Sequence, residues 1–248
     1  MGELVRVEHL KKYFNTPGGL LHAVDDVSFT INEGETLGVV GESGCGKSTL
    51  GRTVLKLIDN TDGKIFFDGK DITNISKAEN IELRKQMQII FQDPYSSLNP
   101  RLCVADLIAD PLKTFHLMSG AEREKKVFEL MDMVGLSRRF TYSYPHELDG
   151  GRRQRIGVAR ALALNPKFLF VSEPTRGIDV GAKALVLESL KKFNRESGVT
   201  VVMISSELEE LRQICDRIAI VSGGAVSGIL PASAPSEEFG MLMVSNVK

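Results

Sequence analysis

The chain has 248 residues, which is long enough for one large domain or two small ones. Its 31 Lys and Arg residues are balanced by 32 Asp and Glu residues, and the formal net charge of −1 excludes nucleic-acid binding driven by overall positive charge. No apolar run is long enough to cross a bilayer, residues 1–12 lack the apolar core of a signal peptide, and the three cysteines lack metal-ligand spacing. These features predict a globular protein of a reducing cytoplasm.

The first part of the chain carries three strand signals and one helix signal. Residues 4–10 and 23–31 alternate apolar and polar side chains, as half-buried strands do. Residues 35–41, "ETLGVVG", are more continuously apolar and predict a buried strand that leads into a glycine-rich loop. A helix is predicted beyond this loop, over residues 49–57.

The middle of the chain differs from its two ends. Helical periodicity is found there, with few strand signals, in residues 104–112, 122–134 and 153–164. Short apolar strands separated by helical stretches are predicted again further on, at residues 167–171, 198–204 and 217–221. This order predicts one α/β domain over residues 1–248. Its parts are a core of residues 1–92 and 166–230, an α-helical insert of residues 93–165 and a C-terminal tail of residues 231–248.

A glycine-rich motif, Gly41-x-x-x-x-Gly46-Lys47-Ser48, lies between the predicted strand and the predicted helix. Glycines let backbone N–H groups curl around phosphates, which then lie at a helix N-terminus. Lys47 would reach the β- and γ-phosphates of ATP, and the Ser48 hydroxyl would ligate Mg²⁺. The predicted nucleotide-binding residues of this loop are Gly41, Glu42, Ser43, Gly44, Cys45, Gly46, Lys47, Ser48 and Thr49.

Further motifs follow this loop in a fixed order. Gln92 stands in "IIFQDPYSSLNP", a second glycine element, "ELDGGRRQR", opens another predicted helix, and "FLFVSEPT" comes after it. With these motifs the chain resembles, over residues 4–221, the ATP-binding subunit of an ABC transporter. The resemblance implies a P-loop NTPase core with a mixed sheet, an N-terminal antiparallel β subdomain and an inserted α-helical subdomain.

The resemblance also implies roles for residues outside the phosphate-binding loop. Tyr13 lies where the family stacks an aromatic ring on adenine. Gln92 matches the Q-loop glutamine, which serves catalysis and Mg²⁺, and Glu173 matches the catalytic glutamate. The residues that match the signature motif and the D-loop, and so belong to the predicted nucleotide site, are Asp149, Gly150, Gly151, Arg152 and Asp179.

Three positions depart from the family pattern. Ser172 stands where the family has an aspartate that holds Mg²⁺ through water, and a neutral hydroxyl is a poorer partner for a hard cation. Ser206 stands where the family has a switch histidine that contacts the γ-phosphate and the attacking water, so it is a catalytic candidate by position. Asp149 replaces the signature serine, and its charge opposes a phosphate unless an arginine such as Arg152 or Arg153 offsets it. These changes predict ATP binding with impaired hydrolysis.

The resemblance implies two kinds of protein partner. One is a second ATP-binding subunit, in a head-to-tail homodimer or heterodimer. The other is a transmembrane permease whose coupling helix docks near residues 93–101, which places the chain in the cytoplasm on the inner face of the membrane. Residues 4–167 resemble oligopeptide or dipeptide importers, whereas residues 168–248 resemble the second ATPase half of sugar or nucleoside importers. The transported substrate can therefore be a peptide, a sugar or a nucleoside. The chain can also be a hybrid of the two subfamilies, either natural or engineered.

Two other functions stay open. A non-catalytic ATP-binding regulator is consistent with Ser172 and Ser206. A nucleotide-gated clamp of DNA repair or chromosome organisation carries related motifs, but the chain lacks the sustained heptads of such proteins, and its charge does not favour a nucleic-acid partner.

Overall fold

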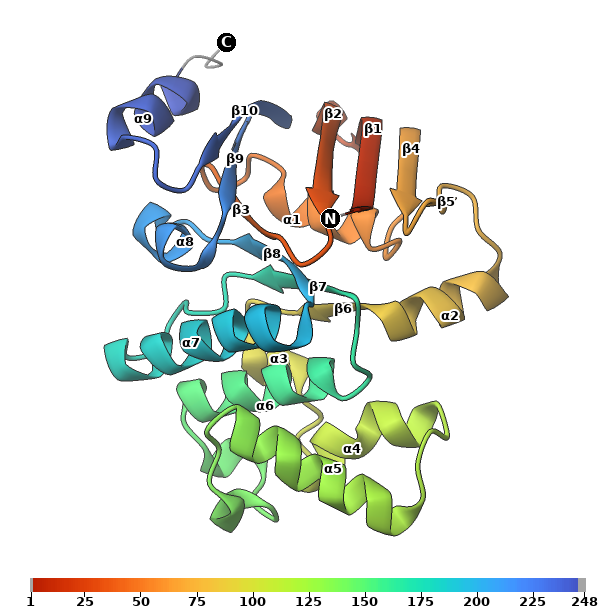
Figure 1. Cartoon of the computed structure of the whole chain (residues 1–248). Helices are drawn as coiled ribbons and strands as arrows, with labels where there is room; N and C mark the ends of the chain where they lie inside the picture. Colours follow the sequence, from red (N-terminus) through yellow and green to blue (C-terminus); the bar gives the residue numbers. More distant parts are fainter. Residues whose placement is uncertain (1, 245–248) are drawn as a thin grey trace. The chain divides into compact units, whose positions relative to one another are not determined.

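The computed structural model describes residues 2–244 and divides them into two compact units (Figure 1). The first unit comprises residues 2–84 and 198–244, and the second comprises residues 85–197. Met1 and the last four residues of the predicted 231–248 tail lie outside the described residues. The predicted boundaries between the core and the α-helical insert, at 92/93 and 165/166, stay predictions. Within residues 2–244, no helix is long and apolar enough to pass through a bilayer.

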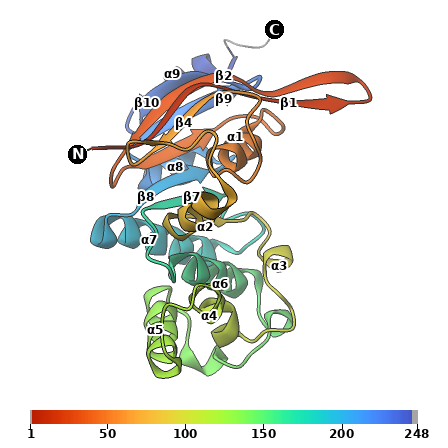
Figure 2. The ribbon, with the colours of Figure 1, turned by 90° about the vertical axis from the view of Figure 1, so that its right-hand side faces the viewer.

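An antiparallel sheet forms one part of the first unit. Its strands follow the order β2 (Gly19–Asn32), β1 (Glu3–Thr16), β4 (Asp62–Phe67) and β5 (Lys70–Asp71). The predicted strands at 4–10 and 23–31 are confirmed, but both are longer than predicted, because Thr16 pairs with Gly19 and the two strands join in one hairpin. Figure 2 shows this hairpin projecting beyond the rest of the sheet.

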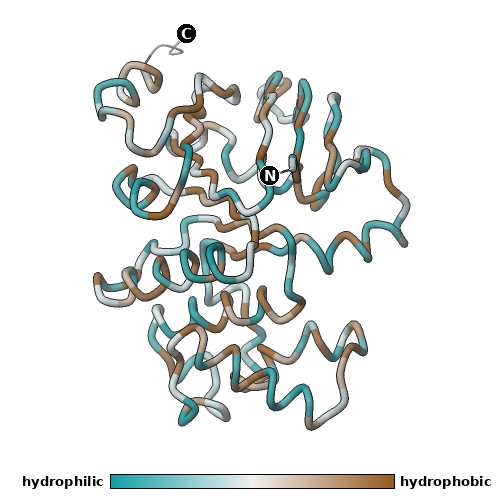
Figure 3. Tube along the Cα trace, viewed as in Figure 1, coloured by the Kyte–Doolittle hydropathy of each residue, from teal (hydrophilic) through white to brown (hydrophobic). Residues whose placement is uncertain are grey.

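A second set of strands in the first unit carries the glycine-rich loop. Here the order is β10 (Ala225–Pro231), β9 (Arg217–Ser222), β3 (Thr36–Val40) and β8 (Thr200–Ile204). β3 is parallel to both β8 and β9, and every residue of β3 and β8 is buried. Because both faces of such strands are covered, their sequences are mainly apolar, apart from the buried Thr36 and Thr200. Figure 3 colours the chain by hydropathy. The helices of this unit are α1 (Lys47–Val54), α8 (Leu208–Ile214) and α9 (Ser236–Val244), and α2 (Lys77–Gln86) crosses the boundary between the units.

The second unit is mostly helical. Its two strands, β6 (Met87–Ile90) and β7 (Phe168–Ser172), are parallel. Its helices are α3 (Pro94–Ser97), α4 (Val104–Thr114), α5 (Gly120–Met133), α6 (Gly150–Leu162) and α7 (Val180–Ser197). The predicted helices at 104–112, 122–134 and 153–164 are confirmed as α4, α5 and α6, with ends shifted by up to three residues. The shift at α6 has a local cause, because the Asp149 side chain caps the helix and starts it at Gly150.

The two units together contain the predicted α/β combination: an antiparallel N-terminal sheet, a sheet with parallel strands, and a helical segment within the chain. The apolar core of the second unit lies between α4, α5 and α6, where Leu107, Ile108, Met131 and Ile156 are at most 2% exposed. This packing holds α6, whose first turn carries the second glycine element.

Candidate nucleotide site

The glycine-rich loop joins β3 to α1 in the first unit, as predicted. A side chain at Gly41 would bring a Cβ within 2.1 Å of the Val221 carbonyl oxygen, and one at Gly46 would meet the Ala23 carbonyl oxygen at 2.0 Å. Gly46 also has a φ of 101°, a left-handed backbone conformation that favours glycine. These two glycines therefore let the loop lie directly against neighbouring backbone.

Lys47 is the first residue of α1, and only 7% of its surface is exposed. Its ammonium Nζ donates to the carbonyl oxygens of Gly41 at 2.8 Å and Glu42 at 2.7 Å, and lies 3.7 Å from the Cys45 sulfur. The loop thus curls around a buried cation. Phosphate oxygens are stronger acceptors than these carbonyls, so the same cation is suited to bind a polyphosphate.

The remaining residues of the loop fit a nucleotide that brings its own metal ion. Glu42, Ser43, Gly44 and Ser48 are exposed, whereas Cys45 and Thr49 are half-buried. Among residues 2–244, no three His, Cys, Asp or Glu side chains gather closely enough to hold a metal ion by themselves. Mg²⁺ usually keeps several waters and is bound through substrate phosphates with one or two protein ligands, so the Ser48 hydroxyl at the start of α1 fits that need.

The β1–β2 hairpin lies beside this loop. The Asp25 N–H donates to the Gly224 carbonyl at 2.8 Å, and the Gly224 N–H donates to the Cys45 carbonyl at 3.1 Å. The ring of Tyr13 stacks on His22 with a centroid separation of 4.0 Å, and the Tyr13 hydroxyl donates to Asp25 at 2.5 Å. Tyr13 therefore belongs to the same unit as the loop. No sequence motif marks His22 or Asp25, so neither residue is predicted from the sequence.

In the second unit, Gln92 and Gly150 border one cavity of about 320 Å³. Its other lining residues are Asp93, Pro94, Tyr95, Arg153, Arg176, Gly177 and Ile178. Arg153 is held there by hydrogen bonds from Nε to the carbonyls of Pro145 and Leu148, both 2.9 Å long, and its guanidinium lies over the Tyr95 ring. The cavity therefore joins the predicted Q-loop to the start of the predicted signature helix.

Asp149 and Arg152 form a closed pair at the start of α6. The Asp149 carboxylate accepts a hydrogen bond from the Arg152 backbone N–H at 2.8 Å and forms an ion pair with the Arg152 guanidinium. That guanidinium also lies over the Phe140 ring, 4.8 Å from its centroid. Of the two arginines that could offset Asp149, the structure pairs Arg152, while Arg153 binds carbonyl groups instead.

Glu173 directly follows β7 and has a φ of 47°. Few residues other than glycine adopt this left-handed conformation, and such residues cluster at functional sites. The Arg176 N–H donates to the Glu173 carbonyl at 3.3 Å and so closes a turn that directs the chain away from the strand. Ser172, the last residue of β7, is only 7% exposed. Asp179 caps α7 by accepting from the Ala182 N–H at 2.9 Å.

Ser206 is exposed in the first unit, in the connection between β8 and α8. Its neighbour Ser205 is buried and organises that connection. The Ser205 hydroxyl donates to Glu210 at 2.9 Å and accepts from the Glu207 N–H at 3.0 Å. Residue 206 therefore follows a firmly held turn. The predicted site residues divide between the units: the phosphate-binding loop, Tyr13 and Ser206 lie in the first, and the others lie in the second.

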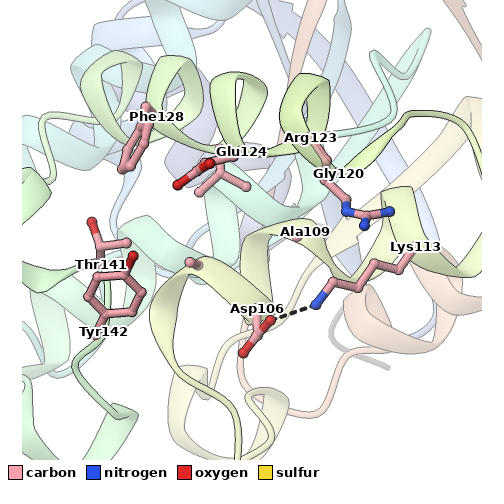
Figure 4. Close-up of a pocket in the computed structure, with 11 residues that line it drawn as sticks. Asp106, Ala109, Lys113, Gly120, Arg123, Glu124, Phe128, Thr141 and Tyr142 are labelled. Carbon is pink, nitrogen blue, oxygen red and sulfur yellow. Dashed lines mark hydrogen bonds and ion pairs between the residues drawn. The ribbon is translucent and has the colours of Figure 1, made fainter.

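A second cavity, of about 150 Å³, lies between α4 and α5 (Figure 4). An ion pair of 2.5 Å between Lys113 and Asp106 borders it, together with the aromatic rings of Phe128 and Tyr142. This cavity contains none of the predicted nucleotide-binding residues. It is a feature of the helical part of the second unit.

Known proteins resemble this chain over most of its length. The model of the ABC transporter family matches residues 24–176. The oligopeptide transport ATP-binding protein OppF of Bacillus subtilis is 45% identical over 232 residues, which cover 93% of this chain and 76% of that protein. The oligopeptide transport ATP-binding protein AppF of the same organism is 43% identical, over 88% of this chain and 69% of that protein.

Among solved structures, the ATP-binding cassette MJ0796 superposes on the chain with a TM-score of 0.86 at 29% sequence identity. The match covers 94% of this chain and all of that one, which was solved as a dimer in a post-hydrolysis state with ADP and Pi. The fold and the family match agree with the motifs found from residue 41 onward. The chain therefore belongs to the ABC transporter family, as an ATP-binding domain with the α/β fold of its cassettes.

Proposed function

We propose that the chain is the ATP-binding subunit of an ABC importer of the oligopeptide type. The observation that carries this proposal is the phosphate-binding loop with Lys47 buried inside it, at the junction of β3 and α1. The names of the similar OppF and AppF proteins support peptides as the transported class. Because these matches extend over about nine-tenths of the chain, they favour the peptide type over a sugar or nucleoside type or a hybrid.

ATP is proposed to bind between two such chains arranged head to tail. Lys47 and Ser48 of one subunit hold the phosphates and Mg²⁺, and Tyr13 stacks on adenine. The signature of the other subunit, Gly150 and Gly151 at the start of α6, offers backbone N–H groups to the γ-phosphate. Binding alone closes this dimer, whereas hydrolysis resets it. The dimeric state of MJ0796 supports the arrangement.

The hydrolytic step is proposed to be slow in this chain. Mg²⁺, when bound with ATP, would polarise the γ-phosphate, and Glu173 would orient the attacking water. Ser172 offers no carboxylate to the metal hydration shell, and Ser206 offers no imidazole to the γ-phosphate. The same two serines favour one alternative, a non-catalytic ATP-binding regulator.

The contact that couples ATP binding to the permease is assigned to the start of the helical part, after Gln92. Asp93 caps the short helix α3 by accepting from the Tyr95 N–H at 2.9 Å, and Tyr95 is 57% exposed. An ordered, exposed aromatic side chain next to the Q-loop glutamine is suited to contact a partner chain. Attachment to a permease places the chain in the cytoplasm, at the inner face of the membrane.

ATP-dependent dimerisation tests the proposal. In the Glu173→Gln variant, ATP with Mg²⁺ is expected to convert monomer into dimer, because the chain binds ATP but cannot remove it by hydrolysis. ADP is expected to leave the chain monomeric. Analytical ultracentrifugation measures both states, and Glu188→Gln, an exposed glutamate on α7, is the matched control. A Glu173→Gln chain that binds ATP and stays monomeric at high protein concentration would contradict the head-to-tail site.

The Asp149–Arg152 pair gives a second expected result. In the Glu173→Gln background, Arg152→Ala is expected to weaken the ATP-dependent dimer by roughly tenfold or more. The Arg152→Ala substitution leaves the Asp149 charge unpaired and facing the phosphate. A contact with a charged group is worth about 1.5–3 kcal/mol, and about 1.4 kcal/mol is a factor of ten in the dissociation constant. Adding Asp149→Ser is expected to restore the dimer, because serine also caps a helix but carries no charge.

The control for this experiment is Arg139→Ala. The Arg139 guanidinium lies 4.7 Å from the centroid of the same Phe140 ring, so this variant removes a similar cation–π contact away from the signature. Sedimentation at several protein concentrations gives the dimer dissociation constant of each variant. Equal dimer affinity with and without Arg152 would mean that Asp149 does not face phosphate.

A further inference from the structure

We propose that Asp25 is a positioning residue for base recognition, whose carboxylate holds the Tyr13 ring, backed by His22, in the orientation that stacks on adenine. The inference rests on the proposed function, since it concerns the base of the same bound nucleotide. It assigns to Asp25 and His22 a task that no sequence motif indicates.

One carboxylate contacts both rings. Asp25 Oδ1 accepts the Tyr13 hydroxyl hydrogen bond at 2.5 Å, and Oδ2 lies 3.3 Å from His22 Nδ1. The two rings are stacked, with centroids 4.0 Å apart and planes 21° from parallel. The Tyr13 hydroxyl and the His22 imidazole both contact the Asp25 carboxylate. The Tyr13 ring therefore loses rotational freedom before a base arrives. His22 covers one face of the ring, so a base stacks on the opposite face.

The same residues are connected to the phosphate-binding loop by backbone. The Asp25 N–H donates to Gly224, and the Gly224 N–H donates in turn to Cys45 within the loop. The neighbouring Ala23 carbonyl lies so close to Gly46 that a Cβ there would approach it to 2.0 Å. The position of the Tyr13 ring is thus set relative to the loop that holds the phosphates, as recognition of one nucleotide at both ends requires.

The surrounding charges keep the Tyr13 hydroxyl a donor. The hydrogen bond to Asp25 raises the pKa of Tyr13 to about 12, and the nearby carboxylates of Asp26 and Asp62 add to this effect. The hydrogen bonds from Tyr13 and His22 lower the pKa of Asp25, helped by Lys11. At neutral pH the pair is therefore a protonated phenol and an ionised carboxylate, which is a stronger hydrogen bond than one between neutral groups.

The test compares ATP with tripolyphosphate, which has the phosphates but no base, by calorimetry in the presence of Mg²⁺. Asp25→Ala is expected to weaken ATP binding about fivefold, less than the loss of a direct contact with a charged group because Asp25 acts through Tyr13, and to leave tripolyphosphate affinity within about twofold. Asp25→Asn is expected to retain most of the ATP affinity, because its amide oxygen still accepts from Tyr13. Asp26→Asn, which removes a neighbouring charge, is the matched control.

A double-mutant cycle identifies the route of the effect. Tyr13→Phe removes the hydroxyl, so Asp25→Ala is expected to add little further loss in that background. His22→Ala is expected to weaken ATP binding modestly, because the Tyr13 ring loses the support of the imidazole. Tighter ATP binding by His22→Ala would show that His22 competes with the base and would overturn the proposed arrangement.

Two outcomes separate this inference from the proposed function. Normal ATP binding that Asp25→Ala does not change, or an equal loss for ATP and tripolyphosphate, would overturn the positioning role alone. Absence of ATP binding by the unmodified chain would overturn the proposed function and this inference with it.

Discussion

Replacing Lys47 with alanine is expected to lower the affinity for ATP by about 10- to 150-fold. A hydrogen bond to a charged group is worth about 1.5–3 kcal/mol, and each 1.4 kcal/mol is a factor of ten in the dissociation constant. In the structure the ammonium group already lies inside the loop, bonded to the carbonyls of Gly41 and Glu42. No large rearrangement is needed for it to meet a phosphate. Isothermal titration calorimetry with MgATP measures the change.

The matched control for this variant is Lys64→Ala, on β4 of the same unit. Lys64 is exposed and lies outside the loop, so its loss changes the net charge equally but is expected to leave ATP affinity unchanged. Urea denaturation verifies that both variants are folded. If Lys47→Ala and the unmodified chain bind ATP equally well, the loop does not hold the phosphates.

Restoring two residues together is expected to increase ATP turnover. Under the proposed function, Ser172→Asp would supply a carboxylate for the Mg²⁺ shell, and Ser206→His would supply an imidazole for the γ-phosphate and water. Supporting residues of a metal site typically change affinity or activity by about 10- to 100-fold. Because both residues are proposed to serve the same hydrolytic step, each single variant is expected to recover little, and the double variant more than the product of the single effects. Steady-state phosphate release at saturating MgATP measures the turnover.

The two positions differ in what they tolerate. Ser172 is 7% exposed at the end of β7, so a carboxylate there is desolvated and is expected to lower stability unless Mg²⁺ pairs with it. Ser206 is exposed, so histidine is expected to fit without loss of packing. Thermal unfolding of Ser172→Asp with and without MgATP is therefore expected to show a larger nucleotide-dependent stabilisation than that of the unmodified chain.

Two controls belong to the turnover experiment. Glu207→His, in place of Ser206→His, puts the imidazole one residue further along the chain and is expected to recover no activity. Glu173→Gln in the double variant is expected to abolish the recovered turnover while ATP binding persists. An unmodified chain that hydrolyses ATP as fast as the double variant would show that other groups supply both functions.

The parts of the fold that were predicted are those with local signals. β3, β7 and β8 are buried along their whole length, so their apolar runs stand out in the sequence. Two of the strands that were not predicted, β5 and β10, lack such a signal. β5 has only two residues, both exposed, and forms through pairing with β4. β10 is mostly half-buried and forms as an antiparallel edge beside β9. Their strand conformation comes from pairing with the preceding strand across a short turn, as between Phe67 and Lys70 or between Ser222 and Ala225, and not from an apolar run of their own.

The sequence by itself determined the phosphate-binding loop, because glycine, lysine and serine at fixed spacing act within nine consecutive residues. The cap of α6 is local as well, since Asp149 contacts backbone only three residues away, although the apolar periodicity placed the start of this helix at residue 153 and not at Gly150. Only the tertiary structure decided that Arg152, and not Arg153, pairs with Asp149. It also decided that Asp25 and His22 surround Tyr13. The physical reason is that side-chain conformations and strand pairing depend on neighbours brought together by folding, such as Phe140 beside Arg152.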